Sequence, residues 1–391
     1  MLLIQNGILY TMEDEAPKRG DILLNSGRIE KIAEKIEPTE KMECLDASGL
    51  RIYPGFIDAH SHLGISEERT TDQCDTSNEG TNPITPCLRA IDGIHPMDSA
   101  FHNALAAGIT GVLTGPGSSN PIGGQFAFIK TYGRRIDSMI VLAPAAMKIA
   151  FGENPMTNYG INGNMPSTRM GIASLIREEL YRARQYFDGN GQADFCMECY
   201  RDLFDKKIPL KAHVHRTDDI FTAIRIAKEF DLDLTLDHCT EGHLIAEEIA
   251  ESGFPAIVGP SLASRTKDEV SLSDFKTPGI LRRAGVRIAL TTDHPVSRIQ
   301  QLPLCAGLAA KEGLGQWDAL RAITIDAARI CGVDQRIGSL RPGKDADLVL
   351  YEGDPLEISA SVKATMIDGE IVWKNQNWLD GPQGSGNTIA G

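Results

Sequence analysis

The segment PGFIDAHSHLG, residues 54–64, places two histidines, His60 and His62, one residue apart after an apolar run. Side chains in a β-strand alternate between its two faces, so residues two apart point the same way. We predict a short buried strand over GFIDA, with both imidazoles at or just past its C-terminal end. Two imidazoles that converge on one point are the beginning of a metal site.

Similar residues end several other apolar runs. They are His213 and His215 in PLKAHVH, His238 in LDLTLDH, Asp293 and His294 in RIALTTDH, and Lys148 in APAAMKIAFGE, with Glu153 following. A single histidine beside a strand is most often a hydrogen-bonded structural residue. Here, four separate strands end in imidazole or carboxylate, and two of them carry the His-x-His spacing. The joint pattern therefore predicts a metal centre.

The middle of the chain alternates apolar runs with amphipathic stretches. The predicted strands are GFIDAH, GITGVLTG, SMIVLAPAAMKIA, PLKAHVH, LDLTLDHC, FPAIVGPS and RIALTTDH, and helices are predicted over stretches such as GIASLIREELYRARQYF and TDDIFTAIRIAKEF. Regular alternation of strands and helices indicates a parallel sheet. So many units favour a closed, TIM-like (β/α) barrel over residues 55–340 instead of an open sheet. In such a barrel the chemistry gathers at the C-terminal strand ends, where the candidate residues lie.

The two chain ends resemble each other and differ from the middle. LLIQNGILYT and GDILLNSGRIEKIAE near the start, and DADLVLYEG and ATMIDGEIVWKN near the end, are strand-like runs with Asn-Gly, Ser-Gly and Asp-Gly turn signals. We therefore predict an α/β protein in which residues 1–54 and 341–391 form a small composite β-sandwich.

Composition restricts the partners and the compartment. The formal net charge of -14 disfavours nucleic acid and anionic membranes as partners, and no apolar run is long enough to span a bilayer. The N-terminus lacks a signal peptide's basic leader, and the eight cysteines are scattered, so we expect a cytoplasmic protein. Cys196 and Cys199 are expected to be packed helix thiols. A homo-oligomer is expected because dimers are the commonest assembly.

At these segments the chain resembles the amidohydrolase superfamily, and within it the imidazolonepropionase-related amidohydrolases. The resemblance covers PGFIDAHSHLG, AAGITGVLTGPGSSNPIGGQ, MKIAFGENP, LKAHVH, LTLDHCTEGH, LTTDHP and the closing IGSLRPGKDADLVLYEGDP. It implies a distorted (β/α)8 barrel with a composite β-sandwich, and one or two divalent metal ions, usually zinc.

The resemblance also implies roles for single residues. The metal ligands it implies are His60, His62 and Asp293 for a buried ion, and His213 and His238 for a second ion. Lys148 falls where dinuclear members carry a carboxylated lysine that bridges both ions, and Glu153 is close enough in sequence to compete for that role. In imidazolonepropionases the strand-five histidine is followed two residues later by a carboxylate, whereas this chain has His215 there. His215 is therefore expected to be a substrate contact or an extra ligand.

The expected function is hydrolysis of a non-ester C–N bond in a small cyclic or linear amide. Bound zinc lowers the pKa of water to roughly 7, so hydroxide is available for the attack. Asp293 would take the proton of this water and pass it to the leaving nitrogen, and the metal or His238 would stabilise the oxyanion. Arg69, Arg216 and Arg298 follow strand ends, where an arginine could hold a substrate carboxylate.

Three alternatives remain open. A prolidase-like dipeptidase and a deaminase of a ring amidine would share the metal core and differ in the substrate pocket. A non-catalytic barrel that serves as a scaffold would be expected to lose metal ligands. This chain retains His60, His62, His213, His238 and Asp293, which ranks the scaffold low.

Overall fold

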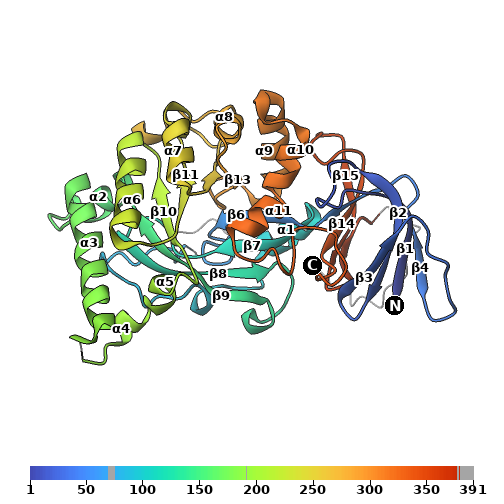
Figure 1. Ribbon diagram of the computed structural model, residues 1–391, viewed down its shortest axis with the longest axis horizontal. Coiled ribbons are helices and arrows are strands. Elements are labelled where there is room, and N and C mark those ends of the chain that lie inside the picture. The colour runs from blue at the N-terminus through green and yellow to red at the C-terminus, as the bar shows by residue number, and fades with distance from the viewer. Residues whose placement is uncertain (69–74, 191, 377, 379–391) are drawn as a thin grey trace.

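The computed structural model describes residues 1–68, 75–190, 192–376 and 378. Within these residues the chain builds two eight-stranded sheets. One sheet forms a nearly closed, TIM-like barrel with helices along its outside, and the other lies beside it and holds the strands nearest to both chain ends (Figure 1).

The barrel sheet keeps the order of the sequence. Its strands are β6 (Phe56–Ser61), β7 (Ile109–Thr114), β8 (Ile122–Lys130), β9 (Ile140–Ala150), β10 (Leu210–Val214), β11 (Leu234–His238), β12 (Ala256–Val258) and β13 (Ile288–Leu290). All of the predicted barrel strands are present, and β8 is an additional one. It pairs antiparallel with both β7 and β9, whereas the other neighbouring pairs are parallel. At β8 the barrel departs from regular (β/α)8 alternation, because residues 115–121 are too few for a crossover helix.

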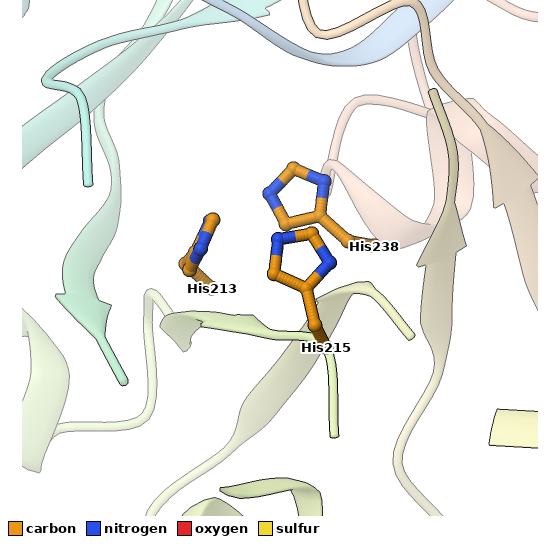
Figure 2. A group of neighbouring side chains, drawn as sticks. All are labelled: His213, His215 and His238. Atoms are coloured by element: carbon orange, nitrogen blue, oxygen red, sulfur yellow. The ribbon is translucent and has the colours of Figure 1, made fainter. Parts of the chain in front are cut away.

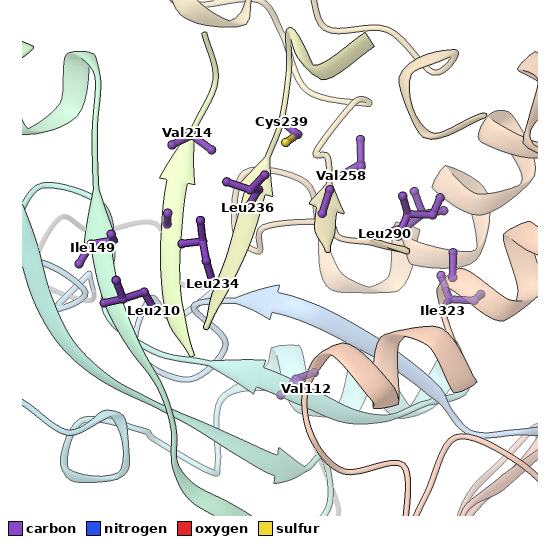
Figure 3. Packing of buried hydrophobic residues seen from close by; sticks show 14 of the residues in the cluster. Val112, Ile149, Leu210, Val214, Leu234, Leu236, Cys239, Val258, Leu290 and Ile323 are labelled. Carbon is purple, nitrogen blue, oxygen red and sulfur yellow. The ribbon is translucent and has the colours of Figure 1, made fainter. Parts of the chain in front are cut away.

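Helices cover the outside of the barrel. They are α1 (Ser99–Ala106), α2 (Glu153–Gly160), α3 (Arg169–Gln185), α4 (Phe195–Glu198), α5 (Arg201–Phe204), α6 (Thr217–Phe230), α7 (Ala246–Ser252), α8 (Thr277–Arg283), α9 (Leu302–Ala309), α10 (Gln316–Ala322) and α11 (Ile325–Ile330). In α6, Ile220, Ala223, Ile224 and Ala227 are buried, and this spacing is that of one helix face. That face packs on strands whose own side chains, such as Leu210, are also buried (Figure 3).

The second sheet combines both chain ends. Its strands are β1 (Leu2–Leu9), β2 (Lys18–Asn25), β3 (Arg28–Ala33), β4 (Glu43–Asp46), β5 (Arg51–Pro54), β14 (Leu348–Glu352), β15 (Ser361–Ile367) and β16 (Glu370–Lys374). The order is β16-β15-β14-β5-β1-β2-β3, with β4 paired to β1, so the two ends meet where β14 pairs antiparallel with β5. The face-to-face packing of a β-sandwich stays a prediction, as do the exact domain boundaries.

Cys196 forms a disulfide with Cys87, and the two Cα atoms are 5.4 Å apart. The expectation that Cys196 is a packed thiol is therefore wrong, because the fold brings to it a residue 109 positions away in the sequence. Cys199 is a free cysteine.

A buried lysine joins the barrel to the second sheet. Lys130, at the end of β8, places Nζ 3.0 Å from Asp345 Oδ2 and 3.1 Å from Asp347 Oδ1. The same Nζ lies 2.6 Å from Asp368 Oδ1, in the turn between β15 and β16. Although burial lowers the pKa of Lys130, the surrounding carboxylates raise it further, and the net shift is upward. The ammonium is therefore the shared counter-ion of this junction.

Replacement of this counter-ion should destabilise the fold. We expect Lys130→Met to lower the free energy of unfolding by about 3–5 kcal/mol, because it leaves the buried carboxylate of Asp347 without its cationic partner. Urea unfolding followed by circular dichroism measures this change. The control is Lys206→Met, which removes an ion pair with Asp231 on the surface and should cost at most about 1 kcal/mol. Equal effects of the two substitutions would contradict the role given to Lys130.

Candidate metal centre

The predicted metal ligands lie at the C-terminal ends of the barrel strands. Among the described residues, two groups have ligand atoms within 4.8 Å of one another: His60, His62 and Asp293, called here the first group, and His213, His215 and His238, called the second group. The rings of His60 and His238 have centroids 5.0 Å apart. The two groups are therefore neighbours within one buried centre.

In the first group, two imidazole nitrogens face one carboxylate oxygen. Asp293 Oδ1 lies 3.3 Å from His60 Nε2 and 3.2 Å from His62 Nε2. The other ring nitrogen of His62, Nδ1, lies 2.7 Å from the carbonyl oxygen of Gly115. A carbonyl can only accept a hydrogen bond, so Nδ1 carries the proton and Nε2 presents a lone pair.

Contact distances assign the proton of His60. A neutral ring carries one proton, and the carboxylate oxygen nearer to the ring is Asp237 Oδ2, 3.1 Å from Nδ1, against 3.3 Å from Nε2 to Asp293 Oδ1. The shorter contact favours the proton on Nδ1, which leaves a lone pair on Nε2. Burial, and next the charge of Lys148, lowers the pKa of His60 to about 3. The ring is therefore neutral near neutral pH, and its Nε2 does not donate to Asp293.

Asp237 is held in its ionised form by a second buried lysine. Lys211 Nζ lies 3.0 Å from Asp237 Oδ1, and both side chains are fully buried. Lys211 also donates to the carbonyl oxygen of Ala59 at 3.1 Å. Burial alone would raise the pKa of Asp237, but Lys211 and His60 lower it below its ordinary value. Asp237 therefore stays a carboxylate and fixes the ring of His60.

The three histidines of the second group turn toward one another (Figure 2). Their ring centroids are 4.5 Å apart for His213–His215, 4.5 Å for His213–His238 and 4.8 Å for His215–His238. His238 Nδ1 lies 2.7 Å from the carbonyl oxygen of Gly259, so its Nε2 presents a lone pair. That Nε2 and both ring nitrogens of His213 are buried without a hydrogen-bond partner.

An unusual backbone conformation allows adjacent residues to reach the same centre. φ is +72° at His238 and +52° at Asp293, in the left-handed region that residues other than glycine rarely adopt. In an extended strand Asp237 and His238 would point to opposite faces. The left-handed residue breaks this alternation, so Asp237 contacts His60 while the His238 ring also faces the centre. Such strain costs about 1–3 kcal/mol per residue and is concentrated at functional sites.

Lys148, on β9, lies among these groups. It is fully buried, its Nζ has no hydrogen-bond partner, and Asp237 Oδ2 is 3.9 Å away. Burial lowers the pKa of Lys148 to about 8. After burial itself, its charge also contributes to the low pKa values of His60 and His213. The charge of Lys148 therefore lowers the pKa of a histidine in each group.

The remaining predicted residues have other surroundings. Glu153 begins α2, and its backbone nitrogen donates to Glu269 Oε2 at 2.8 Å. Arg216 is half-exposed and pairs with Asp218 at 3.1 Å. Arg298 is exposed, and its Nε lies 3.8 Å from Glu68. Arg69 lies outside the described residues.

Three charged residues of the centre are not found by the sequence reasoning. Lys211 stands two residues before His213, so strand alternation could have placed it on the same face. Asp237 precedes His238, and alternation would have placed it on the opposite face. Glu269 lies in the segment between β12 and α8, where no periodic pattern identifies it.

The donors of the first group fit a divalent cation. His60 Nε2 and Asp293 Oδ1 are buried and lack a hydrogen-bond partner, and lone pairs facing each other repel unless a cation lies among them. Imidazole nitrogen and carboxylate oxygen are the donors that zinc and similar ions prefer. His60, His62 and Asp293 are thus suited to hold such an ion.

Comparison with known proteins identifies the family. Residues 174–373 match the family model described as "Amidohydrolase family". A crystal structure of an amidohydrolase from Thermotoga maritima MSB8 is 40% identical to this chain, with a TM-score of 0.93, and the match covers 96% of this chain and 100% of that one. The chain belongs to the amidohydrolase family. The resemblance predicted from the sequence is confirmed.

Two curated relatives extend the comparison of this amidohydrolase. Amidohydrolase tasK of Hapsidospora irregularis is 29% identical over 94% of this chain but only 42% of its own length, so our chain spans less than half of that protein. Imidazolonepropionase of Paracoccus denitrificans (strain Pd 1222) is 26% identical over 95% of this chain and 100% of its own length. Family and relatives make the chain an enzyme that hydrolyses carbon–nitrogen bonds.

No helix in the part of this amidohydrolase that the structure describes has the length and apolar character needed to cross a membrane. The cytoplasmic location and the homo-oligomer stay predictions.

Asp237 should control metal affinity through His60. In Asp237→Asn the amide oxygen is expected to turn to the Lys211 ammonium, so that the amide nitrogen opposes the proton on His60 Nδ1. We expect zinc affinity to fall by about 10–100-fold, as for other residues that orient a metal-binding histidine. Competition with a chromophoric chelator measures this change. Asp233→Asn, at an exposed aspartate just before β11, is the matched control, and unchanged affinity in Asp237→Asn would refute the assignment.

Proposed function

We propose that this amidohydrolase cleaves the C–N bond of a small amide, cyclic or linear, with water activated at a centre of two divalent ions. The observation that carries the proposal is the geometry of the first group. Asp293 Oδ1 lies 3.3 Å from His60 Nε2 and 3.2 Å from His62 Nε2. The second group, next to it, supplies the donors for the second ion.

We infer that the ions are zinc, because the donors are imidazole and carboxylate. His60, His62 and Asp293 would hold one ion, and His213 and His238 the other. A bound zinc ion lowers the pKa of water to roughly 7 and polarises the amide carbonyl. The proton transfers are assigned to side chains of the centre.

Asp293 is the proposed proton carrier. An ordinary aspartate has a pKa of about 3.9, and a cation held among His60, His62 and Asp293 would favour the ionised form further. Asp293 is therefore a carboxylate near neutral pH. It can accept the proton of the attacking water and deliver it to the leaving nitrogen, as a general base and then a general acid.

His238 was predicted both as a ligand and as a stabiliser of the oxyanion. Its Nδ1 donates to Gly259, and its Nε2 carries a lone pair. A lone pair can hold a cation but cannot donate a hydrogen bond to an oxyanion. We therefore propose the ligand role for His238. A substrate contact by His215, Arg216 or Arg69 stays a prediction.

Lys148 is the proposed bridge between the ions. Its buried amine has no hydrogen-bond partner, and its pKa of about 8 leaves part of the population neutral near neutral pH. A neutral amine can add to carbon dioxide and release a proton, which gives a carbamate anion.

This modification can be observed directly. Protein reconstituted with zinc in ¹³C-bicarbonate should show a carbamate carbon signal by NMR, and Lys148→Met should lack it. Exposed Lys207 provides the control, because Lys207→Met should keep the signal. A wild-type spectrum without a carbamate signal would show that Lys148 remains an amine.

Asp293→Asn should abolish most of the turnover. The amide cannot accept the proton, so we expect kcat to fall by at least about 100-fold, with the far-UV circular dichroism spectrum unchanged. Asp137→Asn, at a side chain that is 72% exposed, should leave kcat unchanged. Full activity in Asp293→Asn would contradict the role of Asp293 as proton carrier.

The substrate class is tested by a hydrolysis screen with zinc supplied. It covers N-acyl amino acids, dipeptides, hydantoin-like rings, imidazolone rings and ring amidines. Cleavage of dipeptides alone would favour the prolidase-like alternative, and ammonia release from a ring amidine would favour the deaminase. Protein that binds no divalent ion and turns over no substrate would favour the scaffold.

A further inference from the structure

Glu269 is a buried acidic residue that the proposed reaction does not use. It lies between β12 and α8, and its side chain is 0% exposed. Its Oε1 atom has no hydrogen-bond partner and lies 4.0 Å from His215 Nε2. A buried carboxylate oxygen without a partner is unfavourable, and in native proteins such an atom calls for a cation or a donor.

We propose that Glu269 and His215 complete the second metal position together with His213 and His238, so that a divalent cation is held there by three imidazoles and one carboxylate. The inference rests on the two-ion centre proposed above and adds two ligands to it.

His215 is oriented for this role. Its Nδ1 lies 2.8 Å from Thr240 Oγ1, which fixes the ring, and its ring stacks on that of His238 with an angle of 16° between the planes. The ligand atoms of His213, His215 and His238 all lie within 4.8 Å of one another. An aligned third imidazole therefore belongs to the same cluster as the two predicted ligands.

A specific cradle fixes the Glu269 carboxylate. Glu153 donates its backbone nitrogen to Oε2 at 2.8 Å, and Glu153 Oε1 accepts the backbone nitrogen of Glu269 at 3.3 Å. The preceding residue is Gly152, with φ at +85°, and a Cβ there would collide with Glu269 Oε2. With Oε2 held in this way, Oε1 is left on the side of His215.

Lys267 is the competing explanation for the Glu269 charge. Its Nζ lies 3.9 Å from Glu269 Oε1, which is too long for a hydrogen bond, and it hydrogen-bonds Asn154 Oδ1 instead. Its side chain is 37% exposed, so water screens its charge. Lys267 therefore leaves Oε1 without a close partner.

The number of ligands separates the roles of the two positions. Three protein ligands are typical of catalytic zinc, which keeps one position open, and four are typical of structural zinc. When Lys148 is left out of both positions, the first has three ligands, His60, His62 and Asp293, and the second has four, so the open position for water lies at the first. Four ligands from the chain would hold the second ion even when Lys148 carries no carbamate.

Metal titration tests this inference without an activity assay. Apoprotein, prepared by dialysis against a chelator, is titrated with Co²⁺. The number of bound ions per chain is measured by inductively coupled plasma mass spectrometry. Wild type should bind two ions. Glu269→Gln should keep one and bind the second at least about tenfold more weakly, and His215→Asn should do the same.

Two controls accompany these variants. Asp268→Asn, at the exposed neighbour of Glu269, and Lys267→Met should both bind two ions as wild type does. Circular dichroism melting should show that each variant is folded; should Glu269→Gln fail to fold, His215→Asn decides.

Wild-type affinity for the second ion in both Glu269→Gln and His215→Asn would overturn the inference, as would loss of that ion in Lys267→Met. A wild-type protein that saturates at one ion overturns both this inference and the two-ion centre, but leaves the proposed hydrolysis at the first group intact. A wild-type protein that binds no ion contradicts the proposed function itself.

Discussion

The centre depends on lone pairs that face each other in a buried space. Hydrogen bonds from His62 to Gly115 and the contact of His60 with Asp237 direct both Nε2 atoms toward Asp293 Oδ1. With the ring protons on the Nδ1 atoms, both Nε2 atoms and Asp293 Oδ1 present lone pairs to one another, and a cation among them would relieve this repulsion. The proposed activation of water and the proposed proton transfer by Asp293 both depend on that cation.

The rest of the barrel supports this requirement with buried charge. Lys211 neutralises Asp237, which allows a carboxylate to orient His60 at the middle of an apolar barrel. Strand ends that are distant in the sequence meet because the sheet runs in order from β6 to β13. The left-handed conformation of His238 then directs toward the centre a ring that a regular strand would have turned away.

Much of this arrangement can be predicted from the sequence. Strand alternation predicts that the side chains of His60 and His62 point the same way. The apolar runs predict the barrel strands around them. The antiparallel β8 was missed because it follows β7 after a short loop instead of a helix. Strand alternation does not place Asp237 in the centre, because the neighbouring His238 has a left-handed conformation. Glu269 lies in an irregular segment that has no periodic pattern. The disulfide of Cys196 could not be predicted, because its partner Cys87 is distant in the sequence.

Anomalous X-ray diffraction at the zinc edge, on crystals of the zinc-loaded protein, tests the central claim most directly. The account predicts an anomalous peak among His60 Nε2, His62 Nε2 and Asp293 Oδ1. Crystals grown with excess zinc that keep these side chains in place but show no peak among them would contradict it.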